Sequence, residues 1–158
     1  MSATTATIAS EARLVTFTLD GHVYGVDVNA VQEVLRGQPR TRVPLAPPSL
    51  AGLINLRGQV LTAVDLREQL GMPRRAEDAP EPMLVVVRVE REPIALLVDR
   101  IGAVVDVHAD SFEPPPDTLT GPGCNLINGA YKLEGTLLLA LDVERAIEVT
   151  SDGRRAHR

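Results

Sequence analysis

The sequence predicts a mostly β protein that consists of two small β-barrels and a few short helices. Three observations indicate this class: short apolar stretches recur at close spacing along the 158 residues, Gly- and Pro-rich turns separate them, and few stretches have helical periodicity. A chain of this length can bury a core without disulfides. Because 44% of its residues are hydrophobic but only 3% are aromatic, we expect a core of Val, Leu, Ile and Ala.

The first elements follow from the spacing of apolar side chains. Residues 1–11 are rich in Ser, Thr and Ala, and we expect them to be flexible. Residues 13–28 alternate between apolar and polar side chains around an Asp-Gly pair, which is typical of a β-hairpin. From Asp27, a capping residue, the apolar spacing becomes helical as far as Leu35 and predicts a first helix. The proline-rich loop 37–49 follows as an ordered connection.

Residues 52–67, GLINLRGQVLTAVDLR, predict two strands around a tight turn and then a short helix. Asp65 is the expected cap of that helix, with Glu68 as its capping-box partner. Arg57 is unexpected at the turn, because a guanidinium left unpaired in an apolar core is strongly destabilising. Arg57 therefore either lies on an exposed turn, which Gly58 makes possible, or is held by a specific partner.

The second half of the chain repeats this style. Residues 83–99 predict two strands joined at a charged turn, and residues 101–107 predict a third. A proline-stiffened loop covers residues 108–124, and residues 125–147 predict a closing hairpin and a helix. The stretches AVDLREQL and ALDVERAI are alike, which indicates two related halves. The predicted layout is a flexible N-terminus 1–11, a first barrel over about 12–71, a linker 72–82, a second barrel over about 83–148 and a flexible tail 149–158.

Composition and charge argue against several classes of protein. A net charge of −5, with two Phe, two Tyr and no Trp, argues against a nucleic-acid-binding β-barrel, which needs basic and aromatic residues on one face. A single cysteine gives no disulfide framework, and the N-terminus is not a signal peptide. Because the longest apolar runs are also too short to span a membrane, we expect a cytoplasmic protein without membrane insertion.

The sequence offers no positive sign of catalysis. The three histidines lack metal-ligand spacing, and nothing places a base beside Cys124. Asp65, Asp99 and Asp142 each follow an apolar strand, where helix capping or strand-end solvation explains them. We therefore expect no enzyme activity, no cofactor and no metal. A small enzyme remains an alternative, and it would require a convergent polar pocket.

The stretch GLINLRGQVLTAVDLR resembles the central signature of the CheW family, the coupling proteins of bacterial chemosensory arrays. The resemblance covers residues 12–148. It includes VTFTLDGHVYGVDVNAVQEVL, ALLVDRIGAVVDV, FEPPP and INGAYKLEGTLLLALDVERAI, in the family's order. One position departs from the family, since Thr62 stands where its members usually have proline, and threonine suits a strand at least as well.

The resemblance implies two SH3-like five-stranded barrels packed on a common hydrophobic seam. It also implies a non-catalytic adaptor that bridges the cytoplasmic tip of a chemoreceptor, a methyl-accepting chemotaxis protein, and the regulatory domain of the histidine kinase CheA. Further CheW copies are possible partners in array rings, and the protein would be recruited to membrane-associated receptor arrays. The chain shows no receiver or kinase segment, which favours a stand-alone coupling protein. Flagellar chemotaxis, pilus-based motility and another output all remain open.

The resemblance also assigns positions to each partner. In the family the receptor tip lies in a groove where the barrels meet, and the matching positions are Val31, Glu33, Arg57, Met83, Ile101 and Val104. Ordinary core packing is the alternative for the aliphatic ones. Glu33 is the candidate partner of Arg57, and both an ion pair and a direct receptor contact remain open.

Kinase binding is expected at loops and strand edges. One face is predicted at Pro39, Arg40, Arg42 and Val43, and the other at the loop region 108–116. Simple solvation is the alternative for the two arginines. Gly52 and Gly58 are predicted to be structural turn residues.

Overall fold

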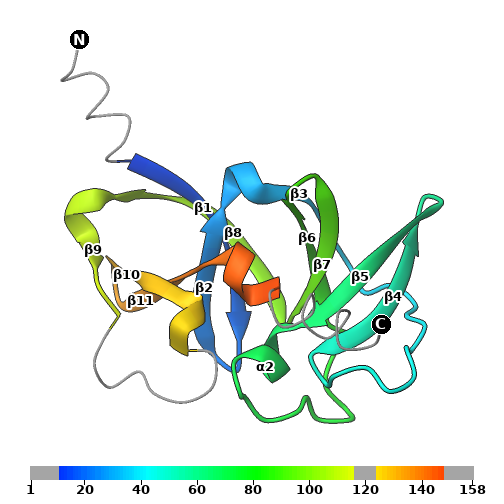
Figure 1. The fold of residues 1–158 in the computed structure, drawn as a ribbon. Coiled ribbons are helices and arrows are strands. Elements are labelled where there is room, and N and C mark those ends of the chain that lie inside the picture. The colour runs from blue at the N-terminus through cyan, green and yellow to red at the C-terminus, as the bar shows by residue number, and fades with distance from the viewer. Residues whose placement is uncertain (1–10, 116–123, 148–158) are drawn as a thin grey trace.

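The computed structural model describes residues 11–115 and 124–147, so the ends predicted to be flexible lie outside it apart from Glu11 (Figure 1). The described strands are β1 (Glu11–Leu19), β2 (His22–Asp27), β3 (Val31–Leu35), β4 (Leu50–Leu56), β5 (Gln59–Asp65), β6 (Met83–Val89), β7 (Glu92–Val98), β8 (Arg100–His108), β9 (Phe112–Glu113), β10 (Ile127–Leu133) and β11 (Thr136–Leu141). The helical elements are η1 (Val28–Ala30), α2 (Leu66–Gln69), η2 (Ala109–Ser111), η3 (Cys124–Leu126) and residues 143–147. The predicted mostly β class is confirmed.

The strands form two sheets with equivalent plans. The six-stranded sheet has the order β8-β1-β2-β11-β10-β9, and the five-stranded sheet has the order β3-β6-β7-β5-β4. In each sheet the second strand of an antiparallel hairpin, β2 or β7, pairs in parallel with the strand that precedes a helix, β11 or β5. The two-residue strand β9 is an addition to one sheet. The likeness of AVDLREQL and ALDVERAI therefore reflects two related halves.

The sheets do not follow the predicted barrels 12–71 and 83–148, and this corrects the sequence-based layout. β1 and β2 pair with β8 and β11, while β6 and β7 lie between β3 and β5. The two halves thus exchange their hairpins, and the segment 72–82 connects α2 to β6 within one sheet. Local patterns identify each hairpin, but the sheet to which a hairpin belongs depends on contacts between residues far apart in sequence.

Three hydrophobic clusters divide the interior of the molecule. One contains residues of the five-stranded sheet only, among them Ile54, Leu61 and Leu84, and another contains Leu14, Val107 and Leu138 of the six-stranded sheet. The largest cluster takes residues from both sheets and forms the seam between the barrels. Its fully buried members include Phe17, Leu19, Val85, Leu96 and Val98. The seam predicted from the family resemblance is therefore present.

The helix predicted to begin at Asp27 and reach Leu35 is wrong. Asp27 does cap a turn, since its carboxylate accepts a hydrogen bond from the Asn29 N–H, but that turn is the three-residue η1 and β3 follows it. Burial alternates along β3, and it pairs with β6 at the edge of the sheet. Three β-branched valines favour a strand over a helix, and a window this short fits both periods.

The second predicted helix is present as α2, and Asp65 caps it by accepting from the Arg67 N–H. The predicted capping box is absent from α2, because the Asp65 N–H donates to the Ser49 carbonyl and Glu68 faces Arg74 instead. Thr62 is buried in the middle of β5, between β4 and β7, so the threonine fits the strand as predicted.

Candidate functional site

Arg57 and Gly58 form the two-residue turn between β4 and β5, which pair up to Leu56 and Gln59. Both turn residues have positive φ, 52° for Arg57 and 84° for Gly58, as the right-handed twist of a tight hairpin requires. The Asn55 carboxamide oxygen accepts a hydrogen bond from the Gly58 N–H at 3.0 Å. The predicted exposed turn is confirmed, and it holds an arginine in a conformation that costs a non-glycine residue free energy.

Arg57 also has the predicted partner. Its Nη1 donates to Glu33 Oε2 at 2.9 Å and its Nη2 donates to Glu33 Oε1 at 2.6 Å, which is a bidentate ion pair. These hydrogen bonds lower the pKa of the Glu33 carboxyl. The carboxylate side chain is 19% exposed while the guanidinium side chain is 70% exposed. Because β3 and β4 are opposite edges of the five-stranded sheet, the pair also links those two edges.

The aliphatic residues predicted to contact the receptor occupy strands β3, β6 and β8. Val31, Met83 and Ile101 are half-buried and pack against the seam cluster. Val104 differs from them because it is 52% exposed on β8, a strand at the edge of the six-stranded sheet. The structure thus separates one freely accessible apolar side chain from three that also serve the core.

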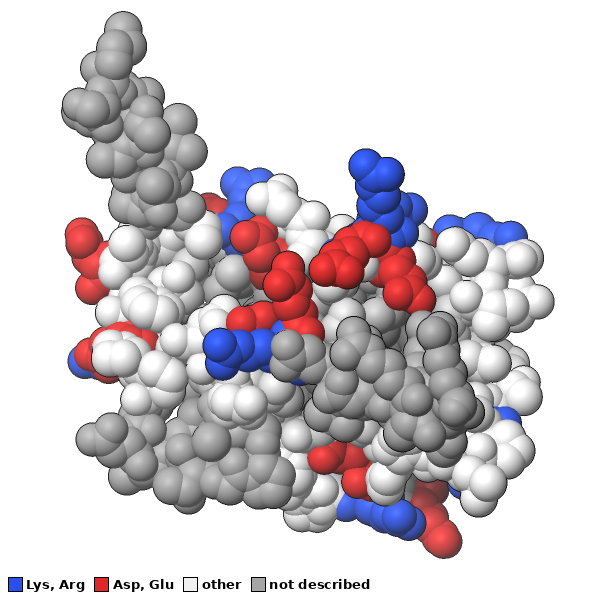
Figure 2. Space-filling view, in the orientation of Figure 1, with Lys and Arg blue, Asp and Glu red and all other residues white. Residues whose placement is uncertain are grey.

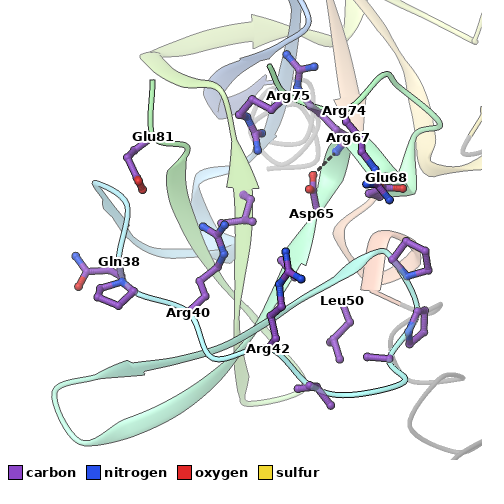
Figure 3. A pocket seen from close by; sticks show the side chains of 17 residues that line it. Gln38, Arg40, Arg42, Leu50, Asp65, Arg67, Glu68, Arg74, Arg75 and Glu81 are labelled. Carbon is purple, nitrogen blue, oxygen red and sulfur yellow. Dashed lines mark hydrogen bonds and ion pairs between the residues drawn. The ribbon is translucent and has the colours of Figure 1, made fainter. Parts of the chain in front are cut away.

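A pocket with a volume of about 640 Å³ lies beside the loop that follows β3 (Figure 3). All four residues predicted to bind the kinase on this side, Pro39, Arg40, Arg42 and Val43, line it. The opposite wall comes from α2 and the segment that follows it, with Arg67, Glu68, Arg74 and Arg75. The sequence placed the loop arginines at an interface but did not predict that a pocket joins them to α2.

A backbone contact closes the five-stranded barrel beside this pocket. The Thr41 N–H donates to the Leu53 carbonyl at 2.9 Å, and the Leu53 N–H donates back to Thr41 at 2.8 Å. Gly52 has φ +139°, and a Cβ there would lie 2.6 Å from the Thr41 carbonyl oxygen. Gly52 lies within β4 and not at a turn, so the predicted turn role is wrong, and glycine is required there by the close approach of two backbones.

A cluster of ionic side chains centred on Asp99 was missed by the sequence reasoning, which explained Asp99 by solvation. Arg67 donates to both of its carboxylate oxygens, at 2.9 and 2.6 Å, and Arg75 donates to Oδ1 at 2.9 Å. The backbone N–H of Asp20 donates to Oδ2. Burial alone would raise the pKa of Asp99, but these hydrogen bonds outweigh it and hold the pKa at about 2. The spacing of charged residues along the chain does not predict this cluster, because Asp20, Arg67 and Arg75 are far from Asp99 in sequence.

The second region predicted for kinase contact, 108–116, is described up to residue 115. Phe112 on β9 is 40% exposed, and its ring lies 5.1 Å from that of Tyr131 at an interplanar angle of 60°. It packs over Gly129, where an added Cβ would come within 2.5 Å of the ring. An aromatic side chain is thus fixed in place with part of its surface accessible.

Charge is distributed in small groups on the surface. Acidic and basic side chains are interspersed on the face seen in Figure 2. Within residues 11–115 and 124–147, no group of three or more His, Cys, Asp or Glu side chains is arranged to hold a metal ion. No helix in that part of the chain is long and apolar enough to cross a membrane.

Comparison with known proteins agrees with this fold. The family model of the CheW-like domain matches residues 13–151. The chain is 29% identical over 147 residues to the chemotaxis protein CheW of Bacillus subtilis, covering 93% of this chain and 94% of that one. It is 30% identical to CheW of Rhizobium meliloti, with 83% and 84% covered, and 28% identical to CheW of Treponema pallidum, with 84% and 80% covered.

The fold is also similar to a solved structure. The scaffolding protein TtCheW from Thermoanaerobacter tengcongensis superposes with a TM-score of 0.74 at 27% identity, over 82% of this chain and 88% of that one. The region that the family model matches, residues 13–151, contains all but the first two residues of the two sheets, together with the turn of Arg57. With its sequence signature, paired barrels and family match in agreement, the chain belongs to the CheW-like family of chemotaxis scaffold proteins.

Proposed function

We propose that the chain is a non-catalytic coupling protein that bridges chemoreceptor cytoplasmic tips and the histidine kinase CheA and so controls the kinase. The observation that carries this proposal is the CheW-like match over residues 13–151, which includes both barrels. A coupling protein of this kind acts by contact: a change in the receptor shifts the adaptor against the kinase without any bond being made or broken. Its place would be the cytoplasm, at membrane-associated receptor arrays.

The receptor side of this proposal uses the strands at the junction of the barrels. Val104 offers an exposed apolar contact and Arg57 an exposed, fixed charge, while Val31, Met83 and Ile101 support them from the seam. A helical receptor tip docks through apolar anchors surrounded by a polar rim, and these side chains supply both.

The kinase side uses the loop residues Pro39, Arg40, Arg42 and Val43, and on the other barrel the region around Phe112. Two kinase-binding faces on different barrels would let the adaptor alternate with CheA-like domains in a ring. A second copy of this chain could take the same place as the kinase domain.

The test is capture of CheA and of a receptor cytoplasmic fragment, both from the organism that makes this chain, by the purified protein. We expect both to be retained, and retention of neither would overturn the proposal. Val104→Glu should lose the receptor fragment but keep CheA. Leu137→Glu, at another exposed apolar position, is the matched control and should keep both.

A further inference from the structure

The pocket beside the β3–β4 loop has a charge pattern that the rest of the molecule does not suggest. The chain has a net charge of −5, yet the pocket is lined by more basic than acidic side chains. The basic ones are Arg40, Arg42, Arg67, Arg74 and Arg75, and the acidic ones are Asp65, Glu68 and Glu81. A cavity of about 640 Å³ is large enough to receive several side chains of a partner.

The fold aims two of these arginines into the pocket together. Thr41 is held in extended conformation by its two backbone hydrogen bonds to Leu53. Residues on either side of an extended position point to the same face, so Arg40 and Arg42 project together. Figure 3 shows both reaching from the loop toward the wall that carries Glu68 and Arg67.

Arg40 and Arg42 differ from the other arginines of the pocket in having no ion pair within the described residues. Arg67 and Arg75 form ion pairs with Asp99, and the Arg74 guanidinium lies 3.5 Å from the Glu68 carboxylate. Among the described residues, neither Arg40 nor Arg42 has a carboxylate partner. Guanidinium groups bind carboxylates and phosphates with paired hydrogen bonds, so an anionic ligand is the complement of this site.

The remaining lining favours carboxylates on a polypeptide over a compact phosphate. Most of the pocket surface is polar, but aliphatic and proline side chains also contribute to it, among them Val43, Ala46, Pro47 and Leu50. Apolar side chains of a peptide could pack there, whereas a phosphate gains nothing from them. The carboxylates of Glu68 and Glu81 would repel a concentrated polyanion more than separated single charges.

We propose that this pocket binds an acidic segment of a protein partner, whose carboxylates pair with Arg40 and Arg42 while its apolar side chains contact the aliphatic wall. The identity of that partner as the kinase rests on the proposed function. The acidic-segment site itself does not, because its residues and charges are independent of which protein supplies the segment.

The site is tested with a peptide of alternating Glu and Val, acetylated and amidated, against the same peptide with Gln for Glu. Binding to the full chain is followed by NMR through the side-chain Nε–H signals of the arginines. We expect the Glu peptide to shift the signals of Arg40 and Arg42 and the Gln peptide to leave them in place. Raising the salt concentration should weaken the interaction.

Variants assign the effect to the pocket. The double substitution Arg40→Gln with Arg42→Gln should weaken binding of the Glu peptide about tenfold. Arg36→Gln with Arg91→Gln removes the same charge from exposed positions outside the pocket and should leave the affinity within about twofold of wild type. If both double variants lose the same affinity for the Glu peptide, net charge alone explains the binding and the proposed site is overturned.

Two further outcomes decide the class of ligand and separate this inference from the proposed function. Inorganic pyrophosphate that shifts the same signals when the Glu peptide does not would overturn the acidic-segment proposal in favour of a phosphate ligand. If the Arg40→Gln, Arg42→Gln variant captures CheA as well as wild type does, although it has lost affinity for the Glu peptide, the acidic-segment site stands but the kinase is not its partner. Capture of neither CheA nor receptor by wild type would overturn the function while the peptide result still stands.

Discussion

Arg57 combines a strained backbone with a bidentate partner. The tight hairpin turn holds its φ at 52°, as the turns of Asp20 and Glu90 hold theirs, while Glu33 on β3 fixes the position of its guanidinium. The carboxylate is mostly covered while the guanidinium stays 70% exposed. Glu33 therefore orients the charge, and Arg57 presents it.

This arrangement predicts the result of a charge swap, Glu33→Arg with Arg57→Glu. The pair can form again with its charges reversed, so the thermal stability that either single substitution loses should return in the double. Receptor binding should not return, because the exposed position would then carry a carboxylate. The measurements are the melting temperature and the affinity for a receptor cytoplasmic fragment.

A double variant that regains both stability and receptor affinity would show that only the ion pair matters. Arg57→Lys is the conservative control. It keeps the charge but cannot make the fork-shaped contact, so it should retain part of the affinity.

The ion pairs of Asp99 predict that the stability of the folded protein depends on pH. Its pKa lies at about 2 when folded against an ordinary value of 3.8, so the unfolded chain takes up the proton first as the pH falls. The stabilisation by Arg67 and Arg75 is thus complete above about pH 4 and is lost between about pH 4 and 2. Asp99→Asn should cost about 2 kcal/mol at pH 7, and this difference from wild type should shrink toward pH 2.

Thermal melts of wild type and of the Asp99→Asn variant between pH 7 and pH 2 measure this stability difference. Asp106→Asn is the control, because the Asp106 pair with Arg13 is largely exposed and its loss should cost less than about 0.5 kcal/mol at pH 7. A stability difference for Asp99→Asn that stays constant with pH would contradict the assignment.

The β4 strand and the loop before it depend on one glycine. Gly52→Ala would bring a Cβ to 2.6 Å from the Thr41 carbonyl oxygen in a backbone conformation at φ +139°. We expect a loss of about 1–3 kcal/mol, together with weakening of the Thr41–Leu53 contact that aims Arg40 and Arg42. Weaker binding of the acidic peptide, and of the kinase where it uses this pocket, should accompany the lower melting temperature.

Gly135→Ala is the matched control for that experiment. Gly135 also has positive φ, +78°, but an added Cβ there meets nothing within 4 Å. It should cost about 1 kcal/mol and leave peptide binding unchanged. Equal effects of the two substitutions on binding would argue against a role for Gly52 in shaping the pocket.

Local chemistry explains which elements and contacts the sequence could predict. The tight turns at Asp20-Gly21, Arg57-Gly58 and Glu134-Gly135 carry their own turn residues, so their hairpins were predictable. β3 was mistaken for a helix because five residues fit two periods, and only pairing with β6 decides between them. The Asp99 cluster was not predictable, since its three partners come from separate elements that meet only in the folded chain.

The exchange of hairpins between the halves makes the barrels interdependent. The five-stranded sheet is continuous in sequence from Val31 to Val98, and the six-stranded sheet is built from the segments on either side of it. Neither sheet can cover its seam face alone, because that face is buried by the other. Gln69 of α2 also donates to the Ala146 carbonyl in the closing helix, which ties the two halves across the seam. The surfaces proposed to bind receptor and kinase, each of which includes residues of both barrels, are thus supported by one packed core.

A seam substitution tests whether the barrels unfold together. Leu96 on β7 is fully buried in the seam, and Leu96→Ala should cost about 3 kcal/mol. Both tyrosines, Tyr24 and Tyr131, lie on strands of the other sheet, and the chain has no Trp, so tyrosine fluorescence follows that sheet and, through Tyr24, its side of the seam. If the barrels form one cooperative unit, tyrosine fluorescence and far-UV circular dichroism should show the same transition, lowered by about 6–12 °C. A fluorescence transition that stays at its wild-type temperature would mean that the six-stranded sheet melts independently, and the seam could not then couple the receptor and kinase faces.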